Sequence, residues 1–180
     1  MQNFDLHVPC HLVFGKNRIE ELPKIISKFG KKVLLTYGGG SIKRMGLYDK
    51  VKSLLADCEI FELSGISPNP KISSVRAGVD ICKRENIDVI LAVGGGSVID
   101  ASKNISAGFG YDGDPWDLVL DPSKISKVLP IVTVLTLSAT GSEFDNSAVI
   151  SNPETNEKLP LFGPGKLDPA YSICDPQYTY

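Results

Sequence analysis

Two short runs of glycine and serine are the residues of this sequence best suited to chemistry. Gly38-Gly39-Gly40-Ser41 and Gly94-Gly95-Gly96-Ser97 each stand between an apolar stretch and a segment with helical periodicity. Glycine lets the backbone approach a pyrophosphate, and the first N–H groups of the following helix point at phosphate oxygens. A side chain at Gly95 is expected to fill that space and to strain the backbone. The alternative is a capped tight turn, since neither run matches G-x-G-x-x-G.

The first run has no acidic residue. An acid in this place normally accepts a hydrogen bond from the ribose 2′-hydroxyl of NAD. Gly39, Ser41 and Lys43 instead offer room, a hydroxyl and a cation. This combination favours a 2′-phosphate, so we expect NADP to be preferred and NAD to be accepted as well. The alternative is a flexible turn with a solvated lysine.

Strands and helices must position these runs. Apolar runs predict strands over 32–37, 59–63, 87–93 and 128–135, and helical periodicity predicts helices near 17–29, 42–56, 73–85 and 97–108. Asn17 and Gly30 are expected to begin and end the first helix, and Ser73 or Ser74 to cap the third. Strands that alternate with helices predict βαβ units and a parallel sheet covered on both faces.

Four loops rich in Gly, Ser, Thr or Asn follow predicted strands, at 38–41, 65–70, 94–97 and 136–142. The carboxyl ends of parallel strands meet at one edge of a sheet, so these loops are expected to form one ligand cleft. Outside this alternation we expect one or two short strands in 4–15, and short strands or a hairpin at 148–150, 158–162 and 171–174.

Composition bounds the remaining choices. The 180 residues are 42% hydrophobic, which is enough for one domain over 1–180, of the α/β class that the alternation of strands and helices indicates. The net charge of -2 argues against nucleic acid or an anionic membrane as a partner. Charged residues near the N-terminus predict that there is no signal peptide, and no apolar run reaches the length of a membrane helix. The four cysteines are scattered, which favours reduced thiols in the cytoplasm.

Five motifs carry a family resemblance. YGGGSIKRMGLYDKV, GISPNP, LAVGGGSVIDASK, DPW and LTLSATGSE occur in this order. Together they closely resemble the iron-containing alcohol dehydrogenases, nearest the butanol dehydrogenase and aldehyde reductase branch, from Phe4 to Tyr180. The resemblance implies a Rossmann-like parallel sheet of the dehydroquinate synthase-like type, with a short β-hairpin region near the C-terminal end. It also implies a homodimeric enzyme that interconverts butanol-like primary alcohols and aldehydes with NAD(P)H.

The resemblance also implies where the cofactor lies. Near the adenosine ribose the expected contacts are Gly38, Gly39, Ser41 and Asn69, and Gly40 and Lys43 of the first run are cofactor-binding candidates as well. At the pyrophosphate they are Gly94, Gly95, Gly96 and Ser97. Toward the nicotinamide they are Asp100, Thr136, Leu137, Thr140 and Lys158. The family's Fe²⁺ or Zn²⁺ is held by an Asp and three His of a helical domain placed beyond residue 180. No catalytic or metal-binding residue, and no activity of the chain alone, is therefore expected.

Other candidates have simpler interpretations. His7 and His11 are four apart, but on a strand they need not converge on a metal. Glu143 and Asp145 are expected to serve caps and turns, and Asp145 departs from the Asn or Thr of many relatives. Trp116 is expected to be a packing anchor.

Two alternative functions remain open. Glycerol dehydrogenase and dehydroquinate synthase use a related glycine turn, although the LTLSATGSE stretch argues against both. A stand-alone nucleotide-binding module is the alternative from another class.

Overall fold

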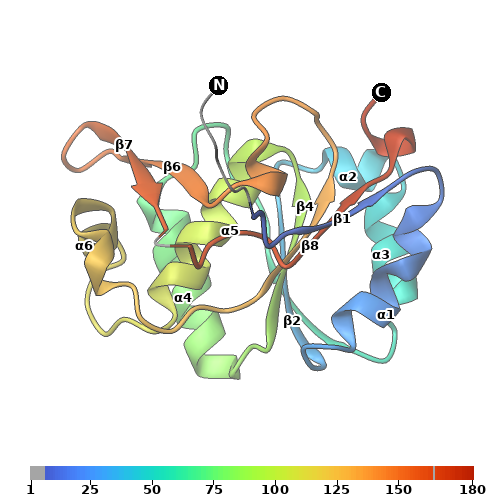
Figure 1. Cartoon of the computed structure of the whole chain (residues 1–180), viewed down its shortest axis with the longest axis horizontal. Coiled ribbons are helices and arrows are strands. Elements are labelled where there is room, and N and C mark those ends of the chain that lie inside the picture. Colours follow the sequence, from blue (N-terminus) through green and yellow to red (C-terminus); the bar gives the residue numbers. More distant parts are fainter. Residues whose placement is uncertain (1–6, 164) are drawn as a thin grey trace.

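The structure, a computed structural model, describes residues 7–163 and 165–180 (Figure 1). Its strands are β1 (His11–Phe14), β2 (Lys32–Tyr37), β3 (Glu59–Leu63), β4 (Val89–Gly94), β5 (Ile131–Leu135), β6 (Ser147–Asn152), β7 (Glu157–Phe162) and β8 (Tyr171–Cys174). Its α-helices are α1 (Leu22–Ile26), α2 (Ser41–Arg44), α3 (Leu47–Leu54), α4 (Ile72–Glu85), α5 (Gly96–Gly108) and α6 (Trp116–Leu120). Short 3-10 turns lie at η1 (Arg18–Glu21), η2 (Pro122–Lys124), η3 (Ser142–Phe144) and η4 (Pro176–Tyr178).

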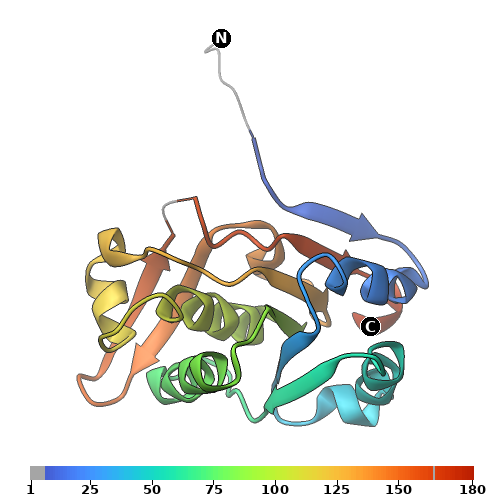
Figure 2. The same ribbon diagram turned by 90° about the horizontal axis from the view of Figure 1, so that it is seen from below.

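Among the described residues, six strands form one parallel sheet in the order β1-β8-β5-β4-β2-β3, and β6 and β7 form a separate antiparallel pair. Helices α1, α2 and α3 cover one face of the sheet, and α4, α5 and α6 lie on the other side (Figure 1). Seen from below, the β6-β7 hairpin runs between α5 and α6, with β6 against α5 and β7 against α6 (Figure 2). The expected Rossmann-like parallel sheet with a hairpin near the C-terminal end is confirmed.

The central strands are apolar on both faces because helices cover both. Val89, Leu91 and Val93 of β4 are buried against the layer of α1 and α3. The alternate residue Ile90 packs with α4 and α6, where Trp116 is also buried, which confirms its packing role. The alternation of side chains along a strand therefore divides one apolar run between two cores.

The helix boundaries differ from the expectation where glycine and proline intervene. The segment predicted as 42–56 is two helices, because Gly46 between them has a φ of 74°, a left-handed conformation that interrupts the helix. The first helix begins as the 3-10 turn η1 and ends at Ile26 rather than beside Gly30. Asn17 makes no side-chain cap there. The cap predicted for the helix after β3 is also wrong, since α4 begins at Ile72 with Lys71 before it.

Two strand predictions need correction. The strand expected from 128 begins only at Ile131, after Pro130, and the strand expected from 87 begins at Val89. Tyr171–Cys174, expected as a short strand or part of a hairpin, is the short strand β8, inserted between β1 and β5 in the main sheet. Of the segment 4–15, residues 4–6 lie outside the described part, and His11–Phe14 forms the edge strand β1.

Candidate cofactor site

The four predicted loops meet at the carboxyl edge of the sheet. They enclose a cavity of about 440 Å³, the glycine cleft, whose lining residues are Gly38, Gly39, Ser41, Ile66, Pro68, Gly95, Gly96, Ser97, Val98, Thr136 and Leu137. These residues follow β2, β3, β4 and β5, which are neighbours in the sheet. The expected convergence of distant loops on one edge is therefore present.

The second glycine run connects β4 directly to α5. Val98 and Ile99 donate their N–H groups to the carbonyl of Gly95, at 3.0 and 3.2 Å. Gly96 and Ser97, the first two residues of α5, line the glycine cleft, and N–H groups at the very start of a helix have no carbonyl one turn back to bond. This end of a 13-residue helix is a suitable place for an anionic group.

Each glycine of this turn avoids a different contact. A Cβ at Gly94 would lie 2.6 Å from Val98 Cγ2, and a Cβ at Gly96 would lie 2.5 Å from Thr140 Oγ1. At Gly95 the nearest atom would be Leu137 Cβ, at 3.1 Å. Gly95 has φ −89° and ψ −169°, an extended conformation open to any residue, so the expected backbone strain there is wrong. A side chain at 95 would act by filling space alone.

The first glycine run lies beside a smaller cavity of about 270 Å³, the Lys43 pocket, lined by Tyr37, Gly38, Gly39, Gly40, Lys43, Ser64 and Gly65. A Cβ at Gly39 or Gly40 would meet no atom within 4 Å, so this loop leaves open space. Lys43 Nζ lies 4.6 Å from the ring centre of Tyr48 and 5.3 Å from that of Tyr37. The Lys43 ammonium thus makes cation–π contacts with both rings and is not a freely solvated side chain.

The loop after β5 is fixed to the second glycine run. The N–H of Thr136 donates to the carbonyl of Gly94 at 3.0 Å, and the hydroxyls of Thr140 and Ser142 lie 2.8 Å apart. Leu137 projects from this loop with 58% of its surface exposed, beside Gly95. The structure therefore places Thr136, Leu137 and Thr140 around the start of α5.

Asp100, one turn into α5, faces the β6 strand. Its Oδ2 accepts the N–H of Val149 at 3.0 Å. Burial raises the pKa of this carboxyl, and the hydrogen bond from Val149 opposes part of that shift. The contact joins the helix of the second glycine run to the hairpin.

Asn69 and Lys158 lie together, although they are 89 residues apart in sequence. The Lys158 ammonium of β7 donates to Oδ1 of Asn69, which has a left-handed backbone with φ 56°. Ser151 of β6 donates its N–H to Pro70 at 2.9 Å. The hairpin thus closes one side of the loop that follows β3.

An ion pair between a buried lysine and a partly exposed aspartate supports helix α5 and was not predicted from the sequence. Lys103 of α5 is fully buried, and its ammonium donates to Asp145 Oδ1 at 2.7 Å, to the Asp145 carbonyl at 2.7 Å and to the Ser147 carbonyl at 2.8 Å. Asp145 also accepts the N–H of Ser147, which confirms its predicted turn role. A lysine among the apolar and small residues of 101–108 was the signal that the sequence offered.

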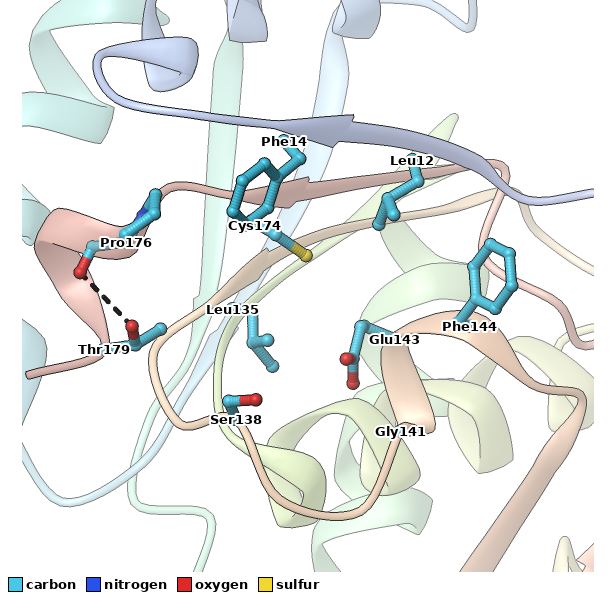
Figure 3. A pocket seen from close by; sticks show the side chains of 10 residues that line it. All are labelled: Leu12, Phe14, Leu135, Ser138, Gly141, Glu143, Phe144, Cys174, Pro176 and Thr179. Carbon is cyan, nitrogen blue, oxygen red and sulfur yellow. Dashed lines mark hydrogen bonds between the residues drawn. The ribbon is translucent and has the colours of Figure 1, made fainter.

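A larger cavity than the glycine cleft lies elsewhere in the described part of the chain. It measures about 560 Å³ and is mostly apolar, with Leu12 and Phe14 of β1, Phe144 of η3 and Cys174 of β8 among its lining residues (Figure 3). The carboxylate of Glu143 lies at its rim in the same view, while the Glu143 carbonyl accepts the hydroxyl of Ser172. No sequence pattern had indicated this cavity.

Metal binding has no support in the described residues, which contain no cluster of three or more His, Cys, Asp or Glu side chains able to hold an ion. His11 stacks on Tyr171 with 4.8 Å between ring centres. Within the described part of the chain, no helix is long and apolar enough to span a membrane.

The parallel sheet with its glycine-lined edge defines a Rossmann-like α/β domain. The family model of the iron-containing alcohol dehydrogenases matches residues 9–176, and the chain belongs to this family.

Known relatives share this family and fold. The chain is 54% identical to NADH-dependent butanol dehydrogenase A of Clostridium acetobutylicum, over 100% of this chain and 46% of the relative. It is 40% identical to the NADPH-dependent aldehyde reductase YqhD of Escherichia coli, over 100% of this chain and 47% of the relative. The crystal structure of NADH-dependent butanol dehydrogenase A from Thermotoga maritima superposes with a TM-score of 0.92 at 44% identity, covering 98% of this chain and 45% of that one. The chain spans about half the length of the curated relatives that it matches.

Proposed function

We propose that this chain is the nicotinamide dinucleotide-binding part of a metal-dependent enzyme that interconverts primary alcohols and aldehydes. The observation that carries the proposal is the glycine cleft, where loops from four neighbouring strands meet at the N-terminus of α5. The reaction class follows from the relatives, whose names include butanol dehydrogenase and aldehyde reductase.

The proposed pyrophosphate site is the turn from Gly94 to Ser97. The free N–H groups at the start of α5 supply donors, and the helix dipole favours negative charge there by about 0.3–1 kcal/mol. The absence of a side chain at Gly95 leaves room beside this turn, whereas the absence of one at Gly96 makes room for Thr140, whose Oγ1 would lie 2.5 Å from a Cβ there. The residues therefore fit a phosphate-bearing cofactor.

The two ends of the dinucleotide follow from that placement. We assign the adenosine ribose to the first glycine run and the Lys43 pocket, with Asn69 nearby, and the nicotinamide end to the side of Asp100, Thr136, Leu137, Thr140 and Lys158. The bound nicotinamide supplies the hydride acceptor or donor. The chain's own residues bind and orient it, and the exposed Leu137 side chain lies beside Gly95 in this cleft.

We propose that both NADPH and NADH bind, with a modest preference for NADPH. Gly39 leaves no carboxylate to repel a 2′-phosphate, and Lys43 offers it a cation. Lys43 is exposed, so its attraction for phosphate contributes about 1 kcal/mol at most, which corresponds to about fivefold. The relatives include one named for NADH and one named for NADPH, which supports a nicotinamide cofactor for this chain.

The described residues do not supply the Asp and three His ligands that the resemblance implies for the family's metal. These residues contain no cluster able to hold Fe²⁺ or Zn²⁺, so we assign no step of the reaction to a metal within this chain. Polarisation of the alcohol oxygen would then depend on residues outside the 180 of this sequence.

We also propose a cytoplasmic homodimer. The four cysteines are free thiols, which suits a reducing compartment. Strand β1 forms an edge of the sheet and exposes 66% of Phe14 and 47% of Leu12, an apolar edge that a second copy could cover. Light scattering tests the dimer directly, and a monomeric mass across micromolar concentrations would contradict it.

Calorimetric titration with NADH, NADPH and AMP tests the cofactor assignment. Saturable binding of both dinucleotides, each tighter than AMP, is the expected result, because AMP lacks the pyrophosphate and nicotinamide contacts. Binding of AMP alone would instead indicate a mononucleotide module. The coding sequence beyond codon 180 tests the enzyme assignment, which requires a following segment with an Asp and three His able to hold a metal.

A further inference from the structure

Lys43 is held by two tyrosine rings and has no acidic partner. Its ammonium lies over the faces of Tyr48 and Tyr37, whose ring centres are 5.7 Å apart in an edge-on arrangement. Among the ion pairs of the described residues, none includes Lys43. Its donors therefore remain free on the side of the Lys43 pocket, next to Gly39 and Gly40.

A single carboxylate fixes both rings. Tyr37 donates its hydroxyl to Glu62 Oε2 at 2.8 Å, and Tyr48 donates to Glu62 Oε1 at 2.8 Å. Lys52 adds a bond to Oε1 at 3.1 Å and balances the charge. We call Glu62, Tyr37 and Tyr48 the tyrosine clip. Its parts come from β2, α3 and β3, so the clip also ties the first glycine run to the edge strand.

Hydrogen bonding to a carboxylate affects the rings as well as their orientation. The phenol that donates to an anion becomes more electron-rich, which strengthens its attraction for a cation over its face. The raised pKa of Tyr48, about 12, and the lowered pKa of Glu62 reflect the same hydrogen bonds, although burial of Glu62 opposes its shift. Both effects require Glu62 to be ionised and bidentate.

We propose that Glu62 is a specificity-determining positioning residue, which seats Lys43 through Tyr37 and Tyr48 to receive a phosphate monoester at the adenosine ribose. The inference rests on the proposed function, because it takes the Lys43 pocket as the ribose site. Glu62 makes no direct contact with the phosphate in this account. It acts through the rings, and its effect is confined to the phosphorylated cofactor.

The variant Glu62→Gln tests the clip by fluorescence titration with NADPH and NADH. An amide has one acceptor oxygen where the carboxylate has two, so one tyrosine hydroxyl can no longer donate and can only accept from the amide NH2 group. The negative charge that makes both rings more electron-rich is also lost, so the rings hold Lys43 less strongly. We expect the NADPH affinity to fall about threefold, the range of an exposed cation–π contact, with the NADH affinity unchanged. Glu59→Gln is the matched control, because Glu59 is an exposed acid of the same strand outside the clip, and it should change neither affinity.

The sign of the change separates the clip from simple charge. Removing a carboxylate near a phosphate would raise the NADPH affinity by charge alone, so a rise or no change in Glu62→Gln overturns the proposal. Tyr48→Phe keeps the ring and removes one hydroxyl, so it tests the clip even if Glu62→Gln fails to fold. A selective loss of NADPH affinity in Tyr48→Phe supports the clip, and an unchanged NADPH affinity refutes it.

NMR measures directly whether Lys43 lies over the two tyrosine rings. The ε-methylene protons of Lys43 should show an upfield ring-current shift that shrinks in Glu62→Gln and persists in Glu59→Gln. A shift that stays the same in Glu62→Gln refutes the clip even if the affinities change. If the unmodified chain binds neither dinucleotide, the proposed function fails, whereas normal binding with an unchanged NADPH to NADH ratio in Glu62→Gln refutes the clip alone.

Discussion

Gly39→Asp should reverse the preference for the phosphorylated cofactor. A Cβ at Gly39 meets nothing within 4 Å, so the new side chain fits without strain. At about 5 Å, with an effective dielectric constant of about 40, a carboxylate and a phosphate of about two charges repel by about 3 kcal/mol, and salt reduces this to about 2 kcal/mol. NADH instead gains a hydrogen bond from its 2′-hydroxyl to the carboxylate, about 1 kcal/mol. Together these terms shift the NADPH to NADH affinity ratio about 100-fold.

Fluorescence titration of both cofactors at two salt concentrations measures this ratio. The repulsion should weaken as salt rises, which a steric effect would not do. Gly39→Asn is the matched control, because its side chain has the same shape without the charge, and its ratio should stay within about threefold of the original. An unchanged ratio in Gly39→Asp would show that Gly39 does not face the ribose, and an equal change in both variants would rule out charge as the cause.

Three further predictions concern the second glycine turn, the Lys103–Asp145 ion pair and alcohol oxidation. Gly95→Val should abolish dinucleotide binding and leave the circular dichroism spectrum intact, because the backbone at 95 is extended; retained binding would place the pyrophosphate elsewhere. Asp145→Ala should lower the free energy of unfolding in urea by about 2 kcal/mol, because it leaves the buried Lys103 ammonium with carbonyl partners only. The loss is no larger because the Asp145 side chain is 42% exposed and solvent screens its charge. A change below about 0.5 kcal/mol would contradict this prediction. The 180-residue chain should not oxidise butanol with added Fe²⁺ or Zn²⁺, and metal-stimulated NADPH formation, followed by absorbance, would show that a catalytic centre has been overlooked.

The sequence was sufficient for the features that depend on local pattern. The apolar runs of β2 and β3 are bounded by Gly30, Gly38 and Gly65, and the parallel sheet follows from their alternation with helices. The clustering of the loops on one edge followed from the geometry of parallel strands, without knowledge of any contact.

Features set by distant partners were beyond the sequence. Nothing in Tyr171–Cys174 indicates that it inserts between β1 and β5, because its pairing joins segments up to about 160 residues apart, as His11 with Tyr171. The sequence shows a glycine at position 46, but residue type alone does not determine the left-handed conformation by which Gly46 divides α2 from α3.

The same limit applies to the supporting residues of the site. Glu62 and Lys103 are charged residues inside ordinary strand and helix patterns, and their partners lie 10 to 44 residues away in sequence. The glycines could be identified because their role is local to the turn. The groups that hold the turns and Lys43 in place become visible only when the sheet brings them together.

Amide chemical-shift mapping with NADH tests the central claim most directly. In ¹H–¹⁵N spectra of the labelled chain, saturating NADH should shift the amides of Gly95, Gly96 and Ser97 most strongly, followed by those of Gly39 and Leu137. The amides around Phe14 and Cys174, which line the larger apolar cavity, should shift little. Shifts centred on that cavity, or no saturable shift in the glycine turn, would contradict the assignment of the glycine cleft as the cofactor site.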